Sequence, residues 1–460
     1  MRDQHRALLI WIKRPGFGPA HDARWHEYDP QDHVSLSTAH EHPRGAAPIS
    51  RDGINTVALV VLCQVAHFLT LAAIPLLLPA IREDLEITFT QAGMLSAAGM
   101  LSYALAQIPA GYLSDRFGPR RLFLIGLLAW SALCVGFGLI HAYWLALATL
   151  FVAGAFRALL FAPGLALLAS WFPSQRRATA MSLFTLGIAG GSILLSLTGP
   201  FLAERYGWRA TFMAFAAVGI GVACLFGAFA SDKPRPQKPK PVSLSVFFGI
   251  ARFPILWVCS WLQFVRFAAL MGFNFWLPSY LVADRGFSLP TAGLIMAMSA
   301  ALSAPANTLG AYVSDRLRNP PLVIGGALAV LAGAAAMLAT VESTSQLLAV
   351  IALYSIFQGF YFGPLFLVPV EVLGNRVAGT TIGFSNLFAN IGGFVCVYSL
   401  GAVRDQSGSF AWGFLGIAVL CLLGVVLAVI LARMRAQALG TAMAGPSSVA
   451  ARPGRLRHSG

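Results

Sequence analysis

The segment Gln263–Pro278 (QFVRFAALMGFNFWLP) repeats the polar pattern of an earlier segment, Gln64–Pro79 (QVAHFLTLAAIPLLLP). In each segment a glutamine is followed after three residues by an ionisable side chain and after fifteen residues by a proline. The two copies are 263 − 64 = 199 positions apart. Repeats at such a distance in an apolar chain are typical of membrane proteins built from two related halves. We therefore expect the two segments to line a site between the halves.

The composition predicts a membrane protein with many spanning helices. Of the 460 residues, 57% are hydrophobic and only 11% are charged, and the mean hydropathy is +0.71. A helix needs about 20 apolar residues to cross a bilayer. Twelve segments near this length lie at roughly 54–80, 90–113, 122–140, 143–170, 178–203, 209–230, 254–282, 290–313, 321–341, 345–371, 377–402 and 411–434.

The basic residues lie in short loops, which indicates membrane topology and not nucleic-acid binding. The net charge is +14, and the cations cluster between apolar segments as the positive-inside rule requires. Twelve spans place both termini on one side, and that side has most of the basic loops. We therefore expect both termini in the cytoplasm and a bacterial inner membrane as the location. Loops on that side contain Arg116, Arg120, Arg121, Arg176, Arg177, Arg316, Arg318 and Arg376.

The apolar segments predict two helical bundles joined by a polar linker. All six cysteines fall in apolar segments without metal-ligand spacing, so we expect neither a metal site nor a disulfide framework. The linker is basic and proline-rich, as solvated connectors often are. The expected organisation is a disordered cytoplasmic tail at 1–53, a six-helix bundle at 54–230, a linker at 231–253, a second six-helix bundle at 254–436 and a cytoplasmic tail at 437–460.

Further repeats support the two bundles. Asp115 recurs as Asp315 (315 − 115 = 200), and Arg176 recurs as Arg376. Because each bundle contains an even number of spans, the two bundles have the same orientation in the membrane. The predicted fold is an all-α membrane protein whose halves are parallel repeats related by an axis along the membrane normal.

The stretch 111–121, GYLSDRFGPRR, resembles the loop between helices two and three of the major facilitator superfamily. Its second copy at 311–318, AYVSDRLR, keeps the aspartate and arginine but lacks both glycines, as is usual in that superfamily. The resemblance covers about residues 54–436 and implies alternating access of two six-helix bundles around a midplane site. Three short pieces, at 171–177, 206–209 and 275–281, look most like its anion:cation symporter branch.

The resemblance also implies a gate on the cytoplasmic side. Asp115 lies near helix ends, where a carboxylate favours the positive end of a helix dipole. The neighbouring arginines can bridge to carbonyls or carboxylates of other helices, and such contacts break when a transporter opens. The alternative is a structural turn whose arginines only set the topology. The expected gating residues are Gly111, Asp115, Arg116, Gly118, Arg120, Arg121, Asp315 and Arg316.

Three ionisable residues, His67, Arg157 and Arg266, lie near the middle of apolar segments. Aspartate and glutamate are absent from the middle of every segment, since Asp284 and Glu371 lie at segment ends. A buried guanidinium needs an anionic partner, and a mobile anion is the partner that the sequence lacks. Arginine binds carboxylates and phosphates through paired hydrogen bonds, which predicts an oxyanion as the substrate.

Each of the buried residues also has a structural alternative. Arg157 could bond backbone carbonyls of a helix kinked near Pro163. His67 could be a neutral packing residue bonded to Gln64, or a proton carrier, because its ordinary pKa is near neutral pH.

The repeat extends the candidate site to amide side chains. Arg157 corresponds to Gln358 (358 − 157 = 201), as His67 corresponds to Arg266. Asparagines of the eleventh segment could bind substrate oxygens or join helices by hydrogen bonds, and Tyr354, Tyr361 and Asn274 are weaker candidates. The expected substrate-binding residues are Gln64, His67, Arg157, Gln263, Arg266, Gln358, Asn386 and Asn390.

These observations predict a secondary active transporter of a small anion, an organic carboxylate taken up with protons, with anion exchange as the close variant. A proton-driven exporter of drugs would need an acidic residue on a central helix face, which the sequence lacks. A non-transporting receptor would be expected to lose the gating motif, which is present. No nucleophile elbow, phosphate loop or metal cluster is found, so we expect no enzyme, cofactor or nucleic-acid partner. We expect a monomer in the lipid bilayer.

The loop charges make the topology testable. An alkaline-phosphatase fusion at Pro239, in the basic linker, should be inactive because the linker is cytoplasmic, whereas a fusion at Ala142 should be active. Phosphatase activity of the two fusions, corrected for expression, shows on which side of the membrane each loop lies. The reverse pattern would invert the assignment of every loop.

Overall fold

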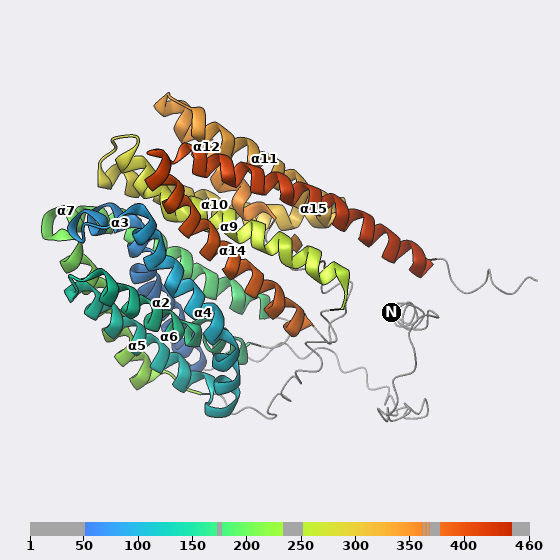
Figure 1. Ribbon diagram of the computed structural model, residues 1–460. Helices are drawn as coiled ribbons and strands as arrows, with labels where there is room; N and C mark the ends of the chain where they lie inside the picture. The colour runs from blue at the N-terminus through green and yellow to red at the C-terminus, as the bar shows by residue number, and fades with distance from the viewer. Residues whose placement is uncertain are drawn as a thin grey trace, which may run out of the picture. The chain divides into compact units, whose positions relative to one another are not determined.

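The computed structural model describes residues 51–172, 177–232, 252–361, 364–365, 368 and 378–443. These ranges are built almost entirely of helices (Figure 1). Contacts divide the chain into two units, of which Ile49–Ala432 contains nearly all of the helical residues. The other unit comprises Met1–Pro48 and Arg433–Gly460, and only the end of its last helix is described. All contacts discussed below lie within Ile49–Ala432.

The helices follow the predicted apolar segments. α2 and α3 form the first span, which is interrupted at Ala72, and α7 contains two spans that meet at Gly207. Gly207 has a φ of 80°, a left-handed conformation that glycine adopts without strain. The helices are α2 (Arg51–Leu71), α3 (Ala73–Asp84), α4 (Phe89–Phe117), α5 (Pro119–Leu139), α6 (Tyr143–Ser170), α7 (Arg177–Phe229), α9 (Pro254–Ala283), α10 (Leu289–Leu317), α11 (Pro320–Thr340), α12 (Thr344–Phe360), α14 (Ala378–Ser407) and α15 (Ala411–Met443).

Nine helical stretches in the described part of the chain are long and apolar enough to cross a membrane. One of them, Thr179–Phe229, has 51 residues, which is enough for two spans of about 20 residues each. α4, with 29 residues, and the shorter apolar helix α12 bring the number of spans to twelve. The predicted all-α membrane fold is confirmed.

Some helix ends differ from the predicted boundaries. α2 begins at Arg51, within the predicted tail at 1–53, and α15 ends at Met443, within the predicted tail at 437–460. The predictions for the rest of both tails and for most of the linker stay predictions, because those residues are not described. Also outside the described residues are Arg176, Glu371 and Arg376.

The first span is broken and its repeat partner is not. Between α2 and α3, Ala72 forms a turn, while α9 is one continuous helix of 30 residues that includes Pro278. Pro75 explains the difference, because proline has no N–H to donate to the carbonyl four residues earlier and its ring crowds that carbonyl. The equivalent position in α9 is Asn274 (274 − 75 = 199), which has the missing N–H.

The two halves repeat the same helix packing. α2 packs on α7 as α9 packs on α14, and α4 packs on α6 as α10 packs on α12. Between the halves, α4 contacts α14 and α10 contacts α7 (Figure 1). The candidate site residues of both halves therefore lie on helices that are held by equivalent neighbours.

Glycines permit this close packing at repeated positions. A Cβ atom at Gly191 would lie 2.5 Å from the Val65 carbonyl oxygen, and one at Gly392 would overlap the Phe264 carbonyl oxygen. Val65 and Phe264 are repeat partners (264 − 65 = 199). Small residues at such contacts let membrane helices approach closely, so these glycines serve packing.

Gly392→Ala should destabilise the fold, because the added methyl group must displace the α9 backbone. Overpacking of this kind costs about 1–3 kcal/mol, so the melting temperature of the detergent-purified protein should fall. Gly383→Ala on the same helix is the matched control, since nothing lies within 4 Å of its added Cβ. Equal melting temperatures for the two variants would contradict this packing.

Candidate functional site

Arg266 lies inside α9, and its side chain is only 4% exposed. Its Nε atom donates a 2.6 Å hydrogen bond to Gln263 Oε1. Residues three apart lie on the same face of a helix, so the spacing seen in the sequence produces this bond. The guanidinium also lies 5.4 Å from the centre of the Phe267 ring and interacts electrostatically with Tyr361. α9 therefore presents a guanidinium that is oriented by its own helix.

Gln263 leaves a buried donor without an acceptor. Its side chain is 1% exposed, and its Nε2 atom has no hydrogen-bond partner among the described residues. An unsatisfied buried donor costs about 1–3 kcal/mol. The pair of Gln263 and Arg266 thus offers hydrogen-bond donors to a group that accepts them.

His67 lies on α2, in the repeat position of Arg266, and is 5% exposed. Neither ring nitrogen has a hydrogen-bond partner in the described part of the chain. The ring packs edge-on against Phe68 and Trp130, at centroid distances of 5.0 Å and 5.3 Å. The alternative in which Gln64 bonds the imidazole is therefore wrong.

Arg157 lies on α6 and is half-buried, and its guanidinium lies 4.1 Å from the centre of the Tyr103 ring on α4. It interacts electrostatically with His67. Within the described ranges it forms neither a salt bridge nor a hydrogen bond, so the alternative of bonds to carbonyls near Pro163 is not supported. Arg157 and Trp130 line the same small cavity of about 20 Å³. His67, Trp130 and Arg157 thus form one group in the first half.

The amide side chains form two further pairs. Asn274 Nδ2 donates to Gln358 Oε1 at 2.9 Å, which joins α9 to α12. Asn386 Nδ2 donates to Gln107 Oε1 at 3.1 Å, which joins α14 of the second half to α4 of the first half. These pairs place the predicted Gln358 and Asn386 in hydrogen bonds between helices.

Two predicted residues have mainly local partners. Asn390 Nδ2 donates to the backbone oxygen of Asn386, one turn earlier on α14, at 2.8 Å. Gln64 is buried on α2 where that helix lies against α7, and a Cβ atom at Gly187 would be 2.9 Å from Gln64 Cβ. Among the described residues, Asn390 thus bonds within its own helix, and Gln64 packs where α2 meets α7.

Sequence reasoning missed Tyr103 and Gln107, both on α4. Tyr103 holds the Arg157 guanidinium, and Gln107 holds Asn386. They are four residues apart, so they lie on the same face of α4. This spacing was the available signal, but the partners on other helices depend on how each helix is rotated.

The predicted gate residues lie at the C-terminal ends of α4 and α10 and in the first turn of α5. Arg120 Nη2 donates to the Gly227 carbonyl oxygen at 2.9 Å, and both residues belong to the first half. Arg121, Asp315 and Arg316 are exposed. A Cβ atom added at Gly111 would meet nothing within 4 Å. The Arg116 guanidinium lies 5.3 Å from the Phe117 ring centre. The side chain of Asp115 is not described.

The residues that follow α4 and α10 both have a positive φ, but their ψ angles are 147° at Gly118 and 23° at Arg318. Gly118 has a φ of 87°, and Arg318, its repeat partner (318 − 118 = 200), has a φ of 51°. A left-handed conformation is easy for glycine and uncommon for arginine. The second copy therefore keeps the positive φ but has a different turn, with Arg318 in the left-handed helical region.

Comparison with known proteins agrees with this architecture. The Major Facilitator Superfamily matches residues 60–397. The hexuronate transporter of Bacillus subtilis (strain 168) is 26% identical over 408 residues, which cover 82% of this chain and 94% of that protein. The nitrite extrusion protein of the same organism is 25% identical over 394 residues, covering 81% of this chain and 93% of that protein.

A solved structure has the same fold. The crystal structure of a bacterial homolog of the human lysosomal transporter Spinster, in an inward-facing and unoccupied conformation, superposes with a TM-score of 0.68 at 20% sequence identity. The match covers 87% of this chain and 98% of that one. With twelve spans, two parallel halves and a family match over most of its length, this multi-pass membrane protein belongs to the Major Facilitator Superfamily, whose members are transporters and not enzymes.

Proposed function

We propose that this protein is a secondary active transporter of a small organic carboxylate, which it takes up with protons by alternating access. Two relatives, the hexuronate transporter and the nitrite extrusion protein, are named for anions, and this chain covers more than nine-tenths of each. The similarity therefore includes both halves of a transporter.

The observation that supports an anion most directly is the environment of Arg157. Its guanidinium is half-buried inside α6, and its contact is an aromatic ring, with no carboxylate within 4 Å among the described residues. A cation at this depth is costly without a partner, and Tyr103 supplies only the modest attraction of a ring face. A substrate anion would supply the missing charge.

The remaining groups favour a carboxylate over a simple halide. A guanidinium is planar and binds the two oxygens of a carboxylate in parallel hydrogen bonds. Gln263 Nε2 adds an unsatisfied buried donor next to Arg266 in the second half. A ligand with several acceptor oxygens, such as a sugar acid, can engage donors of both halves at once.

His67 offers a physical route to proton coupling. An imidazolium next to Arg157 would be repelled by the guanidinium, with which His67 interacts electrostatically. A bound carboxylate would offset that repulsion, so anion binding and proton binding would reinforce each other. Anion exchange is the variant in which His67 stays neutral throughout the cycle.

Loss of the Arg157 guanidinium should weaken anion binding without unfolding the protein. Arg157→Gln removes a cation that has no salt bridge among the described residues, so the melting temperature should stay near wild type. Binding of a hexuronate, measured by isothermal titration calorimetry, should weaken by at least about tenfold, because a charge-assisted hydrogen bond contributes roughly 1.5–3 kcal/mol. Arg266→Lys should weaken binding similarly, since lysine lacks the planar fork.

Arg252→Gln is the matched control, because it removes the same charge at an exposed position before α9. Hexuronate binding by Arg157→Gln within twofold of the control would remove Arg157 from the site. Parallel titrations with nitrite distinguish an organic carboxylate from an inorganic anion as the preferred ligand.

His67→Gln should separate uptake from exchange. If His67 binds the coupling proton, the variant in proteoliposomes should fail to accumulate substrate against its gradient, while exchange of labelled for unlabelled substrate should persist. Both fluxes are measured in the same vesicles with and without an imposed proton gradient. Loss of both fluxes together would assign His67 to substrate binding, and unchanged accumulation would exclude it from coupling.

A further inference from the structure

The two halves touch through glycines at repeat-related positions near the first turns of α4 and α10. A Cβ atom at Gly93 would lie 2.8 Å from the Val397 carbonyl oxygen of α14, and one at Gly293 would lie 2.5 Å from the Ser196 carbonyl oxygen of α7. The glycines are 293 − 93 = 200 positions apart. Both joints lie at the opposite end of α4 and α10 from the predicted gate.

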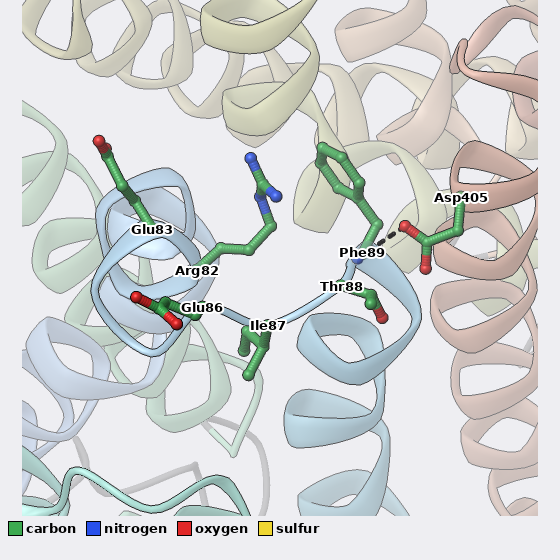
Figure 2. Close-up of a pocket in the computed structure, with 7 residues that line it drawn as sticks. All are labelled: Arg82, Glu83, Glu86, Ile87, Thr88, Phe89 and Asp405. Carbon is green, nitrogen blue, oxygen red and sulfur yellow. Dashed lines mark hydrogen bonds between the residues drawn. The ribbon is translucent and has the colours of Figure 1, made fainter.

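The joint between α4 and α14 has an additional polar contact. Asp405, in the last turn of α14, accepts hydrogen bonds from the backbone N–H groups of Phe89 and Thr90, at 2.9 Å and 2.7 Å, and from the Thr90 hydroxyl at 2.5 Å. Figure 2 shows this carboxylate facing the first turn of α4. The first N–H groups of a helix lack partners within the helix, and the helix dipole favours an anion there. Asp405 of one half therefore caps a helix of the other half.

Cation–aromatic contacts surround the same turn. The Phe89 ring centre lies 4.2 Å from the Arg82 guanidinium and 5.0 Å from the Arg404 guanidinium. Arg404 is held by a 2.8 Å salt bridge to Asp284 within the second half. Phe89 thus contacts a cation of its own half and a cation of the other half. Figure 2 shows Phe89 next to Arg82 and the Asp405 contact.

The joint between α7 and α10 cannot form the same contact. The repeat partner of Thr90 is Pro290 (290 − 90 = 200), which has neither a backbone N–H nor a hydroxyl group. Both helices are also capped by a residue of their own, since the Thr88 hydroxyl oxygen accepts from Gln91 N at 3.2 Å and the Ser288 hydroxyl oxygen accepts from Thr291 N at 3.3 Å. The Asp405 contact is therefore a specific feature of one joint and not a consequence of helix packing.

We infer that Asp405, Phe89 and Thr90 form a latch that holds the two halves together at this end and opens once in each transport cycle. The inference rests on the proposed alternating access. Asp405 is exposed and borders an open hollow of about 700 Å³ that Arg82 and Glu86 also line (Figure 2). Water can replace its hydrogen bonds when the halves separate, so the latch is strong when closed and can be reopened. It complements the predicted gate at the other end of α4.

A distance measurement tests the latch without any substrate. Spin labels are attached to Glu83→Cys of α3 and Gln406→Cys of α14, both exposed, after Cys224→Ser removes the exposed native cysteine. Pulsed electron spin resonance should show mainly short distances in this background. Asp405→Ala should add a population at longer distance, because the closed state loses three hydrogen bonds between the halves.

Glu342→Ala is the matched control, since Glu342 is an exposed carboxylate in the second half and no hydrogen bond or ion pair of the described residues joins it to the first half. It should leave the distance distribution unchanged. If Asp405→Ala also leaves it unchanged, the latch is excluded. This outcome is independent of which substrate the protein transports, so it is distinguishable from failure of the proposed function.

A cross-link then tests whether the latch must open. Thr90→Cys with Asp405→Cys, joined by a short bifunctional reagent that forms a disulfide with each thiol, should arrest transport, and reduction of the two disulfides should restore it. The control pair is Leu400→Cys on α14 with Gly413→Cys on α15, two helices of the same half. A Cβ atom at Gly413 would lie 3.7 Å from Leu400 Cβ, so this pair is close enough to be linked. Transport that continues through the Thr90–Asp405 cross-link would overturn the latch.

Discussion

A cation inside hydrocarbon must be neutralised or hydrogen-bonded, and this constraint determines how the centre of the protein is arranged. Arg266 is oriented by a glutamine on its own helix, whereas Arg157 is oriented by the ring of Tyr103 on a neighbouring helix. Neither contact supplies a negative charge. The two halves solve the same problem differently, and the first half leaves more of the guanidinium for a ligand.

The apolar surroundings also explain why the helices pack through glycines. Backbone groups in the membrane are satisfied within each helix, so close approach between helices depends on small residues. Gly191 and Gly392 bring α7 onto α2 and α14 onto α9 at equivalent points. Those contacts hold the helices that contain His67 and Arg266 in equivalent places, so the repeat in sequence becomes a repeat in the geometry of the site.

At the joints between the halves, symmetry is kept in packing and lost in polar contacts. Gly93 and Gly293 occupy the same position in the two joints, but only α4 has the N–H groups and hydroxyl that Asp405 can bind. A transporter needs joints that close without becoming permanent. Shared glycine contacts provide the shape of both joints, and solvent-exposed hydrogen bonds at one of them can be broken and remade.

Much of the fold could be predicted from the sequence. The apolar length of each segment predicts a membrane span, and the repeat of residues about 200 positions apart predicts the two halves. The cause of the break at Ala72 is visible in the sequence, because the first half has Pro75 where the second half has Asn274. Whether a proline breaks a membrane helix depends on the helix geometry around it. Partners on other helices, such as Tyr103 for Arg157, could not be predicted, since they depend on helix rotation and tilt.

The central claim, that the site binds a carboxylate through its charge, is tested most directly by a thermal-shift comparison on the wild-type protein. A hexuronate and its methyl ester have nearly the same size and hydroxyl groups, but only the acid is an anion. The acid should raise the melting temperature in a concentration-dependent way, because a ligand that binds only the folded state stabilises it, and the ester should not. Equal stabilisation by both compounds would contradict recognition of the charge.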